Sequence, residues 1–404
     1  MLKNIDADAA LQMLYSLPVT LKTEMIAVGS ARSRVVSADV TAKIPVPPFD
    51  RSPFDGYAFR GGDTGFATRE NPAVLKIVEE IPAGTQPKCE IKAGLAAKIL
   101  TGAPIPKGAD STIKYEVTEV SGTELRIFKP VKPNTDVVYK GTDVMPGTML
   151  APMGTVVTAP VIASLANQGF AHVEVFKKPV ITVISTGSEL CGAGETLRPA
   201  AIYDSNTHTI SAYLAEAGCE PQNVGLVPDE PDVIAGQIAA ALQKSDMVIT
   251  TGGASVGDYD WAVTSAERLG AEVLFWKTAM KPGGAIMAAV KDGKVILGLS
   301  GNPAAAALGL FRVAMPYIKK LCGRSDCFFP EIRVALKEAY RKDSPNMRVL
   351  RGRLEITDSS ADFIEHAGQG SEATRSFVGC DLLCEIPKGS PPLEAGSIIK
   401  AYRI

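Results

Sequence analysis

The sequence predicts a multidomain fold of the α/β plus β class, built around a central doubly wound parallel sheet with small β domains beside it. Three observations lead to this prediction: the length of the chain, a stretch in which strand and helix patterns alternate, and short alternating runs outside that stretch. At 404 residues the chain is too long for one ordinary hydrophobic core, so roughly two to four domains are expected.

The alternating stretch covers residues 179–324. Apolar runs of strand length, such as 179–186 and 294–301, alternate with helical segments such as 205–218, whose polar start and final Gly are typical of a capped helix. Residues 302–323 predict a long apolar helix. Strands that alternate with helices favour a parallel sheet with helices on both faces.

Short β patterns flank this stretch. After a short amphipathic helix at 6–16, the Pro-rich segment 44–59 excludes a continuous helix or a central strand. Runs broken by Gly and Pro then predict an all-β module from about 60 to 150. Similar runs over 325–404 predict a small β-barrel or sandwich.

Composition excludes several classes of function. The formal net charge is −2, so no overall basic field favours nucleic acid. The seven cysteines are scattered without metal-site spacing, which indicates reduced thiols and a cytoplasmic location. The acidic N-terminal segment does not have the pattern of a signal peptide, and no apolar run approaches the ~20 residues of a membrane span.

Polar and glycine-rich loops follow the predicted strands of the α/β stretch. In an open α/β sheet, ligands bind beyond the carboxyl ends of the strands, so these loops are expected to meet at one edge. The five loops are 186–190 (TGSEL), 203–206 (YDSN), 228–231 (PDEP), 250–260 (TTGGASVGDYD) and 300–303 (SGNP).

The residue types in these loops indicate a phosphate site with a divalent cation. Glycines let backbone N–H groups approach a ligand, and helix N-termini attract anions. Carboxylates beside a phosphate usually act through a metal ion, so we expect a phosphorylated ligand and Mg²⁺. A single acid in such a loop is more often a turn former or helix cap. The residues are Gly187, Gly252, Gly253, Gly257 and Gly301; Ser205, Ser255 and Asn302; and Glu189, Asp204, Asp229, Asp258 and Asp260.

The segment KTAMKPGG, residues 277–284, is a second candidate. On a continuous strand Lys277, Ala279 and Lys281 would lie on one face, just before a Pro-Gly turn. Two lysines aimed the same way predict a clamp for a dianion. The alternative is an edge strand whose charges only protect it from unwanted pairing.

Ordered motifs along nearly the whole chain resemble one family, the MoeA/gephyrin E-domain family of molybdopterin molybdenumtransferases. The motifs are PPFDRSPFDGYAFR (47–60), LTGAPIPKGAD (100–110), TGSEL, YDSN, TTGGASVGDYD, KTAMKPGG, GLSGNP (298–303), RGR (351–353) and GQGS (368–371). Any one of them could arise by chance, whereas the whole series in order could not.

The resemblance implies an elongated homodimer whose α/β module is of the molybdopterin-binding type. Such an enzyme inserts molybdate into adenylated molybdopterin with Mg²⁺, joins Mo to the dithiolene sulfurs and releases AMP, giving molybdenum cofactor. Molybdopterin adenylyltransferase and recipient molybdoenzymes are further implied partners, and no nucleic acid or membrane is implied. The expected domains are 1–45 with 140–178 (linker and dimerisation), 46–139 (inserted β), 179–324 (α/β) and 325–404 (C-terminal β-barrel).

The resemblance also implies site residues, which we assign at the positions of this chain that match the family's motifs. For Asp55 and Thr101, the alternative to a catalytic role is that they only form turns. If they are catalytic, they would complete the cleft from another domain or from the partner subunit. The implied catalytic residues are Asp55, Thr101, Glu189, Asp229, Asp260, Lys277 and Lys281, with Glu189, Asp229 and Asp260 as metal ligands. The implied substrate-binding residues are Ser205, Asn206, Gly252, Gly253, Ser255, Gly301, Asn302, Arg351 and Ser371.

The chain departs from the family pattern near the expected site, and these departures leave the choice between molybdate and tungstate open. They are Pro53 and Phe54, Ser188 in place of an acid, Ser300 in place of Pro, and Ala304 with Ala305. Three other functions compete. A molybdopterin adenylyltransferase would consume ATP with metal-free molybdopterin, a gephyrin-type scaffold would not need the acids and lysines, and a small-molecule sensor would need no acidic Mg²⁺ site.

Overall fold

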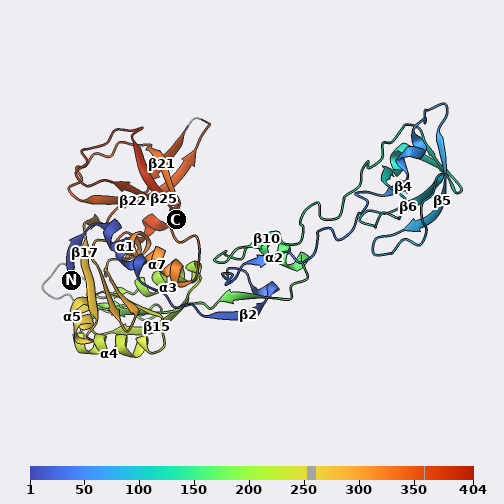
Figure 1. Cartoon of the computed structure of the whole chain (residues 1–404). Helices are drawn as coiled ribbons and strands as arrows, with labels where there is room; N and C mark the ends of the chain where they lie inside the picture. Colours follow the sequence, from blue (N-terminus) through green and yellow to red (C-terminus); the bar gives the residue numbers. More distant parts are fainter. Residues whose placement is uncertain (253–260, 359) are drawn as a thin grey trace. The chain divides into compact units, whose positions relative to one another are not determined.

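The computed structural model describes residues 1–252, 261–358 and 360–404, which form two compact units (Figure 1). Unit 1 comprises Met1–Ala38, Met153–Thr158 and Val173–Ile404, and unit 2 comprises Asp39–Pro152 and Ala159–His172. The finer division into four domains stays a prediction. None of the described helices is long and apolar enough to cross a membrane.

A seven-stranded sheet forms the centre of unit 1. Its order is β1 (Leu2–Ile5), β17 (Glu272–Thr278), β19 (Ile286–Lys291), β20 (Lys294–Leu299), β16 (Met247–Thr251), β12 (Val180–Thr186) and β15 (Glu220–Val227). The predicted fold class is confirmed, with one difference. Neighbouring strands are parallel except that β19 runs antiparallel to both β17 and β20.

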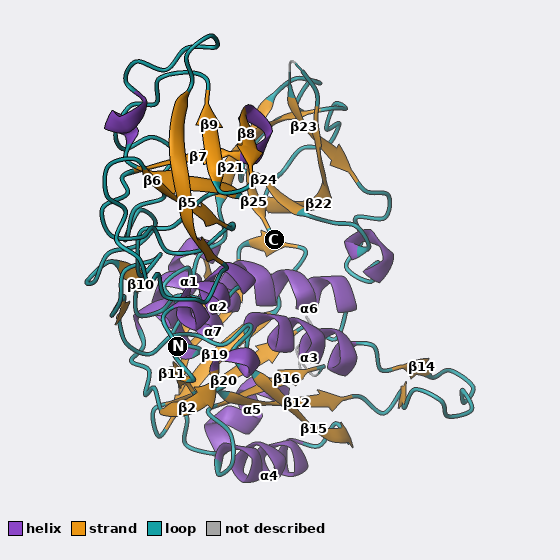
Figure 2. Ribbon diagram, turned by 90° about the vertical axis from the view of Figure 1, so that its right-hand side faces the viewer, coloured by secondary structure: helices purple, strands orange, loops and turns teal. Residues whose placement is uncertain are grey.

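Helices cover both faces of this sheet (Figure 2). Side chains on β12 alternate accordingly: Ile181 and Val183 belong to the core under one helical layer, and Ile184 belongs to the core under the other. The first layer contains α1 (Ala7–Ser16), α3 (Asn206–Ala217), α6 (Pro303–Gly309), the π-helical turn η4 (Leu310–Ala314) and α7 (Met315–Leu321). The second contains α4 (Pro231–Leu242) and α5 (Trp261–Arg268).

The predicted long helix at 302–323 is present but interrupted. The π-helical turn η4 separates α6 from α7, and Pro316 lies in the first turn of α7. Proline has no N–H to donate to the preceding turn, which explains why a regular α-helix does not continue through this point.

A closed β-barrel forms the C-terminal part of unit 1, as predicted. Its sheet order is β18 (Met280–Lys281), β22 (Met347–Ile356), β23 (Ala361–Glu365), β21 (Glu331–Leu336), β25 (Ile398–Arg403) and β24 (Leu382–Ile386). Because β22 also pairs with β24, the last five strands close on themselves around Leu350 and Phe363. The short strand β18 comes from the α/β stretch and joins this sheet through β22.

Unit 2 contains the predicted all-β module. Its six-stranded sheet has the order β7 (Ser111–Lys114), β4 (Gly56–Phe59), β6 (Leu95–Ile99), β5 (Ala73–Ile81), β9 (Glu124–Ile127) and β8 (Thr118–Ser121). Apolar clusters cover both faces, with Phe59 in one and Ala58 in the other. The same unit contains the pair β3 (Val40–Thr41) and β10 (Met149–Ala151) and the helix α2 (Ala159–Asn167).

Candidate functional site

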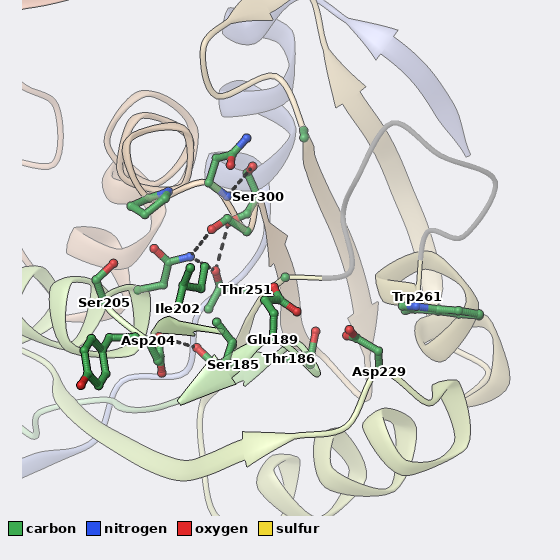
Figure 3. A pocket seen from close by; sticks show the side chains of 18 residues that line it. Ser185, Thr186, Glu189, Ile202, Asp204, Ser205, Asp229, Thr251, Trp261 and Ser300 are labelled. Carbon is green, nitrogen blue, oxygen red and sulfur yellow. Dashed lines mark hydrogen bonds between the residues drawn. The ribbon is translucent and has the colours of Figure 1, made fainter. Parts of the chain in front are cut away.

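A cavity of about 490 Å³ lies at the carboxyl edge of the unit 1 sheet, where the loop prediction placed it (Figure 3). It is formed by the ends of β12, β16 and β20, the loop after β15 and the start of α3. We call it the sheet-edge cavity. The predicted residues that line it are Glu189, Asp204, Ser205, Asn206, Asp229, Gly252, Gly301 and Asn302. Five more predicted residues, Gly253, Ser255, Gly257, Asp258 and Asp260, lie outside the described residues.

A hydrogen-bonded network holds three of these loops together. The Asn206 Nδ2 atom donates to Thr251 Oγ1 at 2.7 Å and to the Gly301 carbonyl at 2.8 Å. Thr251 Oγ1 in turn donates to the Ser300 carbonyl at 3.0 Å. The Asn206 Oδ1 atom is buried and has no partner within the described chain, so a ligand that donates a hydrogen bond would satisfy it.

Asp204 lines the cavity and also caps a helix, which agrees with the capping alternative given for a single acid in these loops. Its Oδ1 atom accepts from the backbone N–H of Thr207, in the first turn of α3, at 3.1 Å and from Ser185 Oγ at 3.2 Å. Asp204 therefore caps the helix, a task that Ser205 does not perform, since the Ser205 side chain makes no capping bond. The helix N-terminus at the cavity is thus held by a buried acid.

Glu189 and Asp229 bring two carboxylates into the sheet-edge cavity from different loops (Figure 3). Asp229 Oδ2 accepts from Ser188 N at 3.4 Å, whereas Oδ1 is buried and has no partner within the described chain. A Cβ at Gly187 would lie 2.9 Å from both Glu189 oxygens, so glycine is needed for this carboxylate position. Among the described residues no three His, Cys, Asp or Glu side chains group closely enough to hold a metal ion alone.

A second cavity, of about 430 Å³, adjoins the first, because Ala285, Ser300 and Asn302 line both. We call it the cationic cavity. The predicted residues Lys277, Lys281 and Ser371 line it, and Gln369 and Gly370 form part of its wall.

Arg348 also lines the cationic cavity and was missed by the sequence prediction. It is the register partner of Lys281 in the β18–β22 pair, which sets two cations side by side. Its Nε atom is buried and has no partner in the described part of the chain. The β18–β22 pairing joins segments far apart in sequence, so no local pattern could have indicated this partner.

The predicted geometry of the two lysines is wrong, although both reach one cavity. Strand β17 ends at Thr278, and Lys277 has a positive φ of 67°, which breaks the assumed continuous strand. Lys281 belongs to β18, in the barrel sheet. The Nζ atom of Lys277 lies 4.2 Å from the centre of the Trp276 ring.

Arg351 is not among the residues that line the cationic cavity, although its Nε and Nη1 atoms have no partner in the described part of the chain. Its side chain is 0 % exposed, and its Nη2 atom donates to the carbonyls of Gly368 and Gly370 at 3.1 and 3.0 Å. Burial lowers the pKa of the guanidinium. Arg351 therefore supports the loop that carries Ser371.

Asp55 and Thr101 lie together on the surface of unit 2. The Asp55 Oδ1 atom accepts from both Thr101 N and Thr101 Oγ1 at 2.7 Å, and these bonds lower the pKa of the Asp55 carboxyl. This geometry agrees with the turn-forming reading and also presents an ionised carboxylate at the surface.

Residues 182–320, which contain the sheet-edge cavity and the two lysines, match the family described as a probable molybdopterin binding domain. The α/β module that carries both cavities is therefore of the molybdopterin-binding class. Residues 5–169 match the MoeA N-terminal region (domain I and II).

Relatives that match nearly the whole chain identify its family. It is 33% identical to the molybdopterin molybdenumtransferase of Bacillus subtilis (strain 168), over 99% of this chain and 94% of the relative, and 32% identical to that of Staphylococcus aureus (strain MRSA252), over 98% and 94%. The crystal structure of the molybdopterin biosynthesis MoeA protein from Pyrococcus horikoshii superposes with a TM-score of 0.83 at 30% identity, covering 99% of both chains. The chain belongs to the molybdopterin molybdenumtransferase family, whose members are transferases of molybdenum cofactor biosynthesis.

Proposed function

We propose that this protein inserts molybdate into adenylated molybdopterin and releases AMP with the help of Mg²⁺. The observation that carries the proposal is the shared wall of Ala285, Ser300 and Asn302 between an acidic, helix-flanked cavity and a cationic one. The first cavity suits a phosphoanhydride with a metal ion, and the second suits a tetrahedral dianion. Because the two cavities adjoin, molybdate in the second would lie beside the dithiolene of a pterin bound in the first.

Mg²⁺ fits the acids of the sheet-edge cavity. It is commonly held by one or two carboxylates together with substrate phosphates and water, which matches Glu189 and Asp229, and the free Oδ1 of Asp229 is a ready ligand atom. We propose Asp260 as a third ligand. When bound, the ion would neutralise charge that builds on the phosphoanhydride as AMP leaves.

The protein's own groups would orient the nucleotide. Gly252 and Gly301 allow the backbone to approach a ligand, and the N-terminal turn of α3, at the positive end of its helix dipole, lies beside Ser205 and Asn206. The unpartnered Oδ1 of Asn206 would accept an N–H from the bound molecule. Gly253 and Ser255 are proposed for the same loop.

Molybdate would lie in the cationic cavity. Lys277, Lys281 and Arg348 supply three positive charges, and none of them is paired with an acid in the described part of the chain. Ser371 adds a hydroxyl donor. Charge-assisted hydrogen bonds of this kind are about twice as strong as neutral ones, which favours a dianion over water.

We also propose a cytoplasmic homodimer in which Asp55 and Thr101 act at the site, either within one chain or across the dimer. The seven cysteines are all free thiols, which fits a reducing compartment. A molybdopterin adenylyltransferase and recipient molybdoenzymes are the proposed protein partners.

Product analysis tests the proposal against the adenylyltransferase alternative. The protein should release AMP from adenylated molybdopterin in the presence of molybdate, and it should not consume ATP with metal-free molybdopterin. The reverse pattern would assign the preceding step instead, and the absence of both activities would favour the scaffold.

A further inference from the structure

Cys219 and Cys322 place two buried thiols in direct contact. Their sulfur atoms lie 3.4 Å apart, and the two residues are only 2% and 3% exposed. They are 103 positions apart in the sequence, so no local pattern predicts the contact. A free cysteine packs like a small apolar residue, and what distinguishes it is the reactivity of its sulfur. A close pair of sulfurs therefore indicates a chemical role.

Both cysteines lie where a helix ends. Helix α3 is closed by Gly218, which has a φ of 105°, and the N–H of Cys219 donates to the Leu214 carbonyl at 2.9 Å. Cys322 caps α7 and donates its N–H to the Ile318 carbonyl at 3.1 Å. A Cβ at Gly218 would lie 3.9 Å from the Cys322 sulfur, so this sulfur packs directly against the end of α3. Main-chain hydrogen bonds thus hold the two thiols beside each other.

The two helical segments that end at these thiols begin at the sheet-edge cavity. Helix α3 starts beside Ser205, and the segment from α6 to α7 starts beside Asn302 and Pro303, all of which line the cavity. Cys219 and Cys322 belong to the same apolar cluster on one face of the sheet. A covalent bond between the sulfurs would therefore connect the far ends of two segments whose N-terminal ends line the cavity.

The resting form of the pair is a dithiol. The hydrogen bond to Cys322 and burial both raise the pKa of the Cys219 thiol, and the positive charges of Lys178 and Arg324 oppose this only in part. Cys219 therefore stays protonated near neutral pH, and it reacts through a small thiolate fraction. Oxidation of the pair should accordingly be slower than that of the exposed Cys89.

We propose that Cys219 and Cys322 form a disulfide when the protein is exposed to hydrogen peroxide, and that this bond locks the ends of α3 and α7 together. One thiol loses its proton and attacks an oxygen of the peroxide, the O–O bond breaks, and a sulfenic acid forms while the departing hydroxide takes up the proton as water. The second thiol then attacks the sulfenic sulfur, the S–O bond breaks, and a second water leaves with the thiol proton. Two thiols and one peroxide thus give one disulfide and two water molecules. A disulfide has a sulfur separation of about 2.05 Å, so the sulfurs need to approach each other by only about 1.4 Å.

Peptide mapping after mild oxidation tests the inference. The reduced full-length protein is treated with hydrogen peroxide, denatured in an alkylating reagent that blocks the remaining thiols, and digested. We expect two peptides linked through Cys219 and Cys322, which separate on reduction with dithiothreitol. The oxidised protein should also unfold at a midpoint roughly 5 °C or more above that of the reduced protein, because a long covalent loop restricts the unfolded chain. Dithiothreitol should restore the original midpoint.

Two variants make the outcome specific. Cys322→Ala removes one partner, so peroxide should produce neither the linked peptides nor the rise in midpoint. Cys327→Ala is the matched control, because Cys327 is also 3% exposed but its sulfur bonds the Arg324 carbonyl at 3.0 Å. This variant should respond to peroxide like the wild type. The linked peptides are measured in the wild type, so the test does not depend on how well either variant folds.

Three results would overturn the inference, and none of them bears on the proposed function. If peroxide modifies the exposed Cys89 while Cys219 and Cys322 are both recovered in alkylated form, the pair serves packing only. A disulfide from either residue to a different cysteine would mean that the assigned pair is wrong. A linked protein whose midpoint is unchanged or lower would show that the bond does not lock the two helices.

Discussion

Asp229 shows at the scale of a single residue how the site can be tested. One of its oxygens is buried and has no partner among the described residues, and Asp229 lines the cavity together with Glu189. Replacing it by Ala should lower AMP release about 10²-fold, the range for losing one electrostatic contributor. Asp232 is the matched control, because its side chain is 86% exposed and pairs only with Arg268 at the surface. Equal activity of Asp229→Ala and Asp232→Ala would exclude the metal role.

Arg348 gives a second prediction at this scale. Its Nε atom has no partner in the part of the chain that the structure describes, and its register with Lys281 indicates a contact with an anion. Arg348→Ala and Lys281→Ala should each weaken molybdate binding about tenfold in calorimetric titration and leave binding of the pterin nucleotide unchanged. Lys388→Ala, an exposed site on the same barrel, serves as the control. If either variant lost affinity for the pterin nucleotide to the same extent, the proposal that the two ligands bind in separate cavities would be wrong.

Sequence patterns located most of the loop residues because strand ends in an α/β sheet meet at one edge. Eight predicted residues line the sheet-edge cavity for this reason. The same reasoning could not distinguish Asp204, which caps α3, from Asp229, since an acid before a helix suits either role. It also missed Arg348, because the pairing that sets this residue beside Lys281 joins segments far apart in the sequence.

At the scale of elements, the seven-stranded sheet of unit 1 has two features that the hydrophobic periodicity of the sequence did not predict. Strand β19 is antiparallel because Asp292 and Gly293, both with positive φ, close a two-residue hairpin to β20. An Asp-Gly pair between apolar runs is a hairpin signal that could have been read. Strand β1 is short and largely exposed, so only its pairing with β17 defines it.

Arg312 forms ion pairs that connect three elements of unit 1, so its replacement should lower the stability of the protein. From η4 it bonds Asp8 on α1 and Glu385 on β24, with its side chain 4% exposed and that of Glu385 5%. Arg312→Met should lower the stability of unit 1 by about 3 kcal/mol, because Glu385 keeps only Lys400 as its partner.

Thermal unfolding measures this effect. Arg268→Met removes a pair whose side chains are 43% and 86% exposed, and it should cost less than about 1 kcal/mol. Similar midpoints for the two variants would show that the Arg312 network contributes nothing beyond a surface ion pair.

At the scale of the whole molecule, the exposed apolar side chains of unit 2 lead us to predict that the protein self-associates. It leaves several large apolar side chains exposed to solvent, which are typical of a surface covered by a partner. They are Ile44, Phe49, Tyr139, Met145 and Met149, each between 40% and 55% exposed. Light scattering at micromolar concentration should give the mass of a dimer. A monomer mass across that range would count against this arrangement.

The broad organisation was readable because strand and helix periodicities differ, and the α/β stretch and both β modules appear where those patterns changed. The closure of the C-terminal barrel through β22 and β24 and the recruitment of β18 were not readable, since they depend on pairing between distant segments.

We propose that this protein cleaves the adenylate and inserts molybdenum in one coupled reaction. The most direct measurement counts AMP released and molybdenum bound to the pterin product, with adenylated molybdopterin, molybdate and Mg²⁺ supplied together. We expect equal amounts of the two products, and loss of both when EDTA removes Mg²⁺. AMP release that is unchanged in EDTA, or AMP released without any molybdenum in the pterin when molybdate is present, would contradict the account.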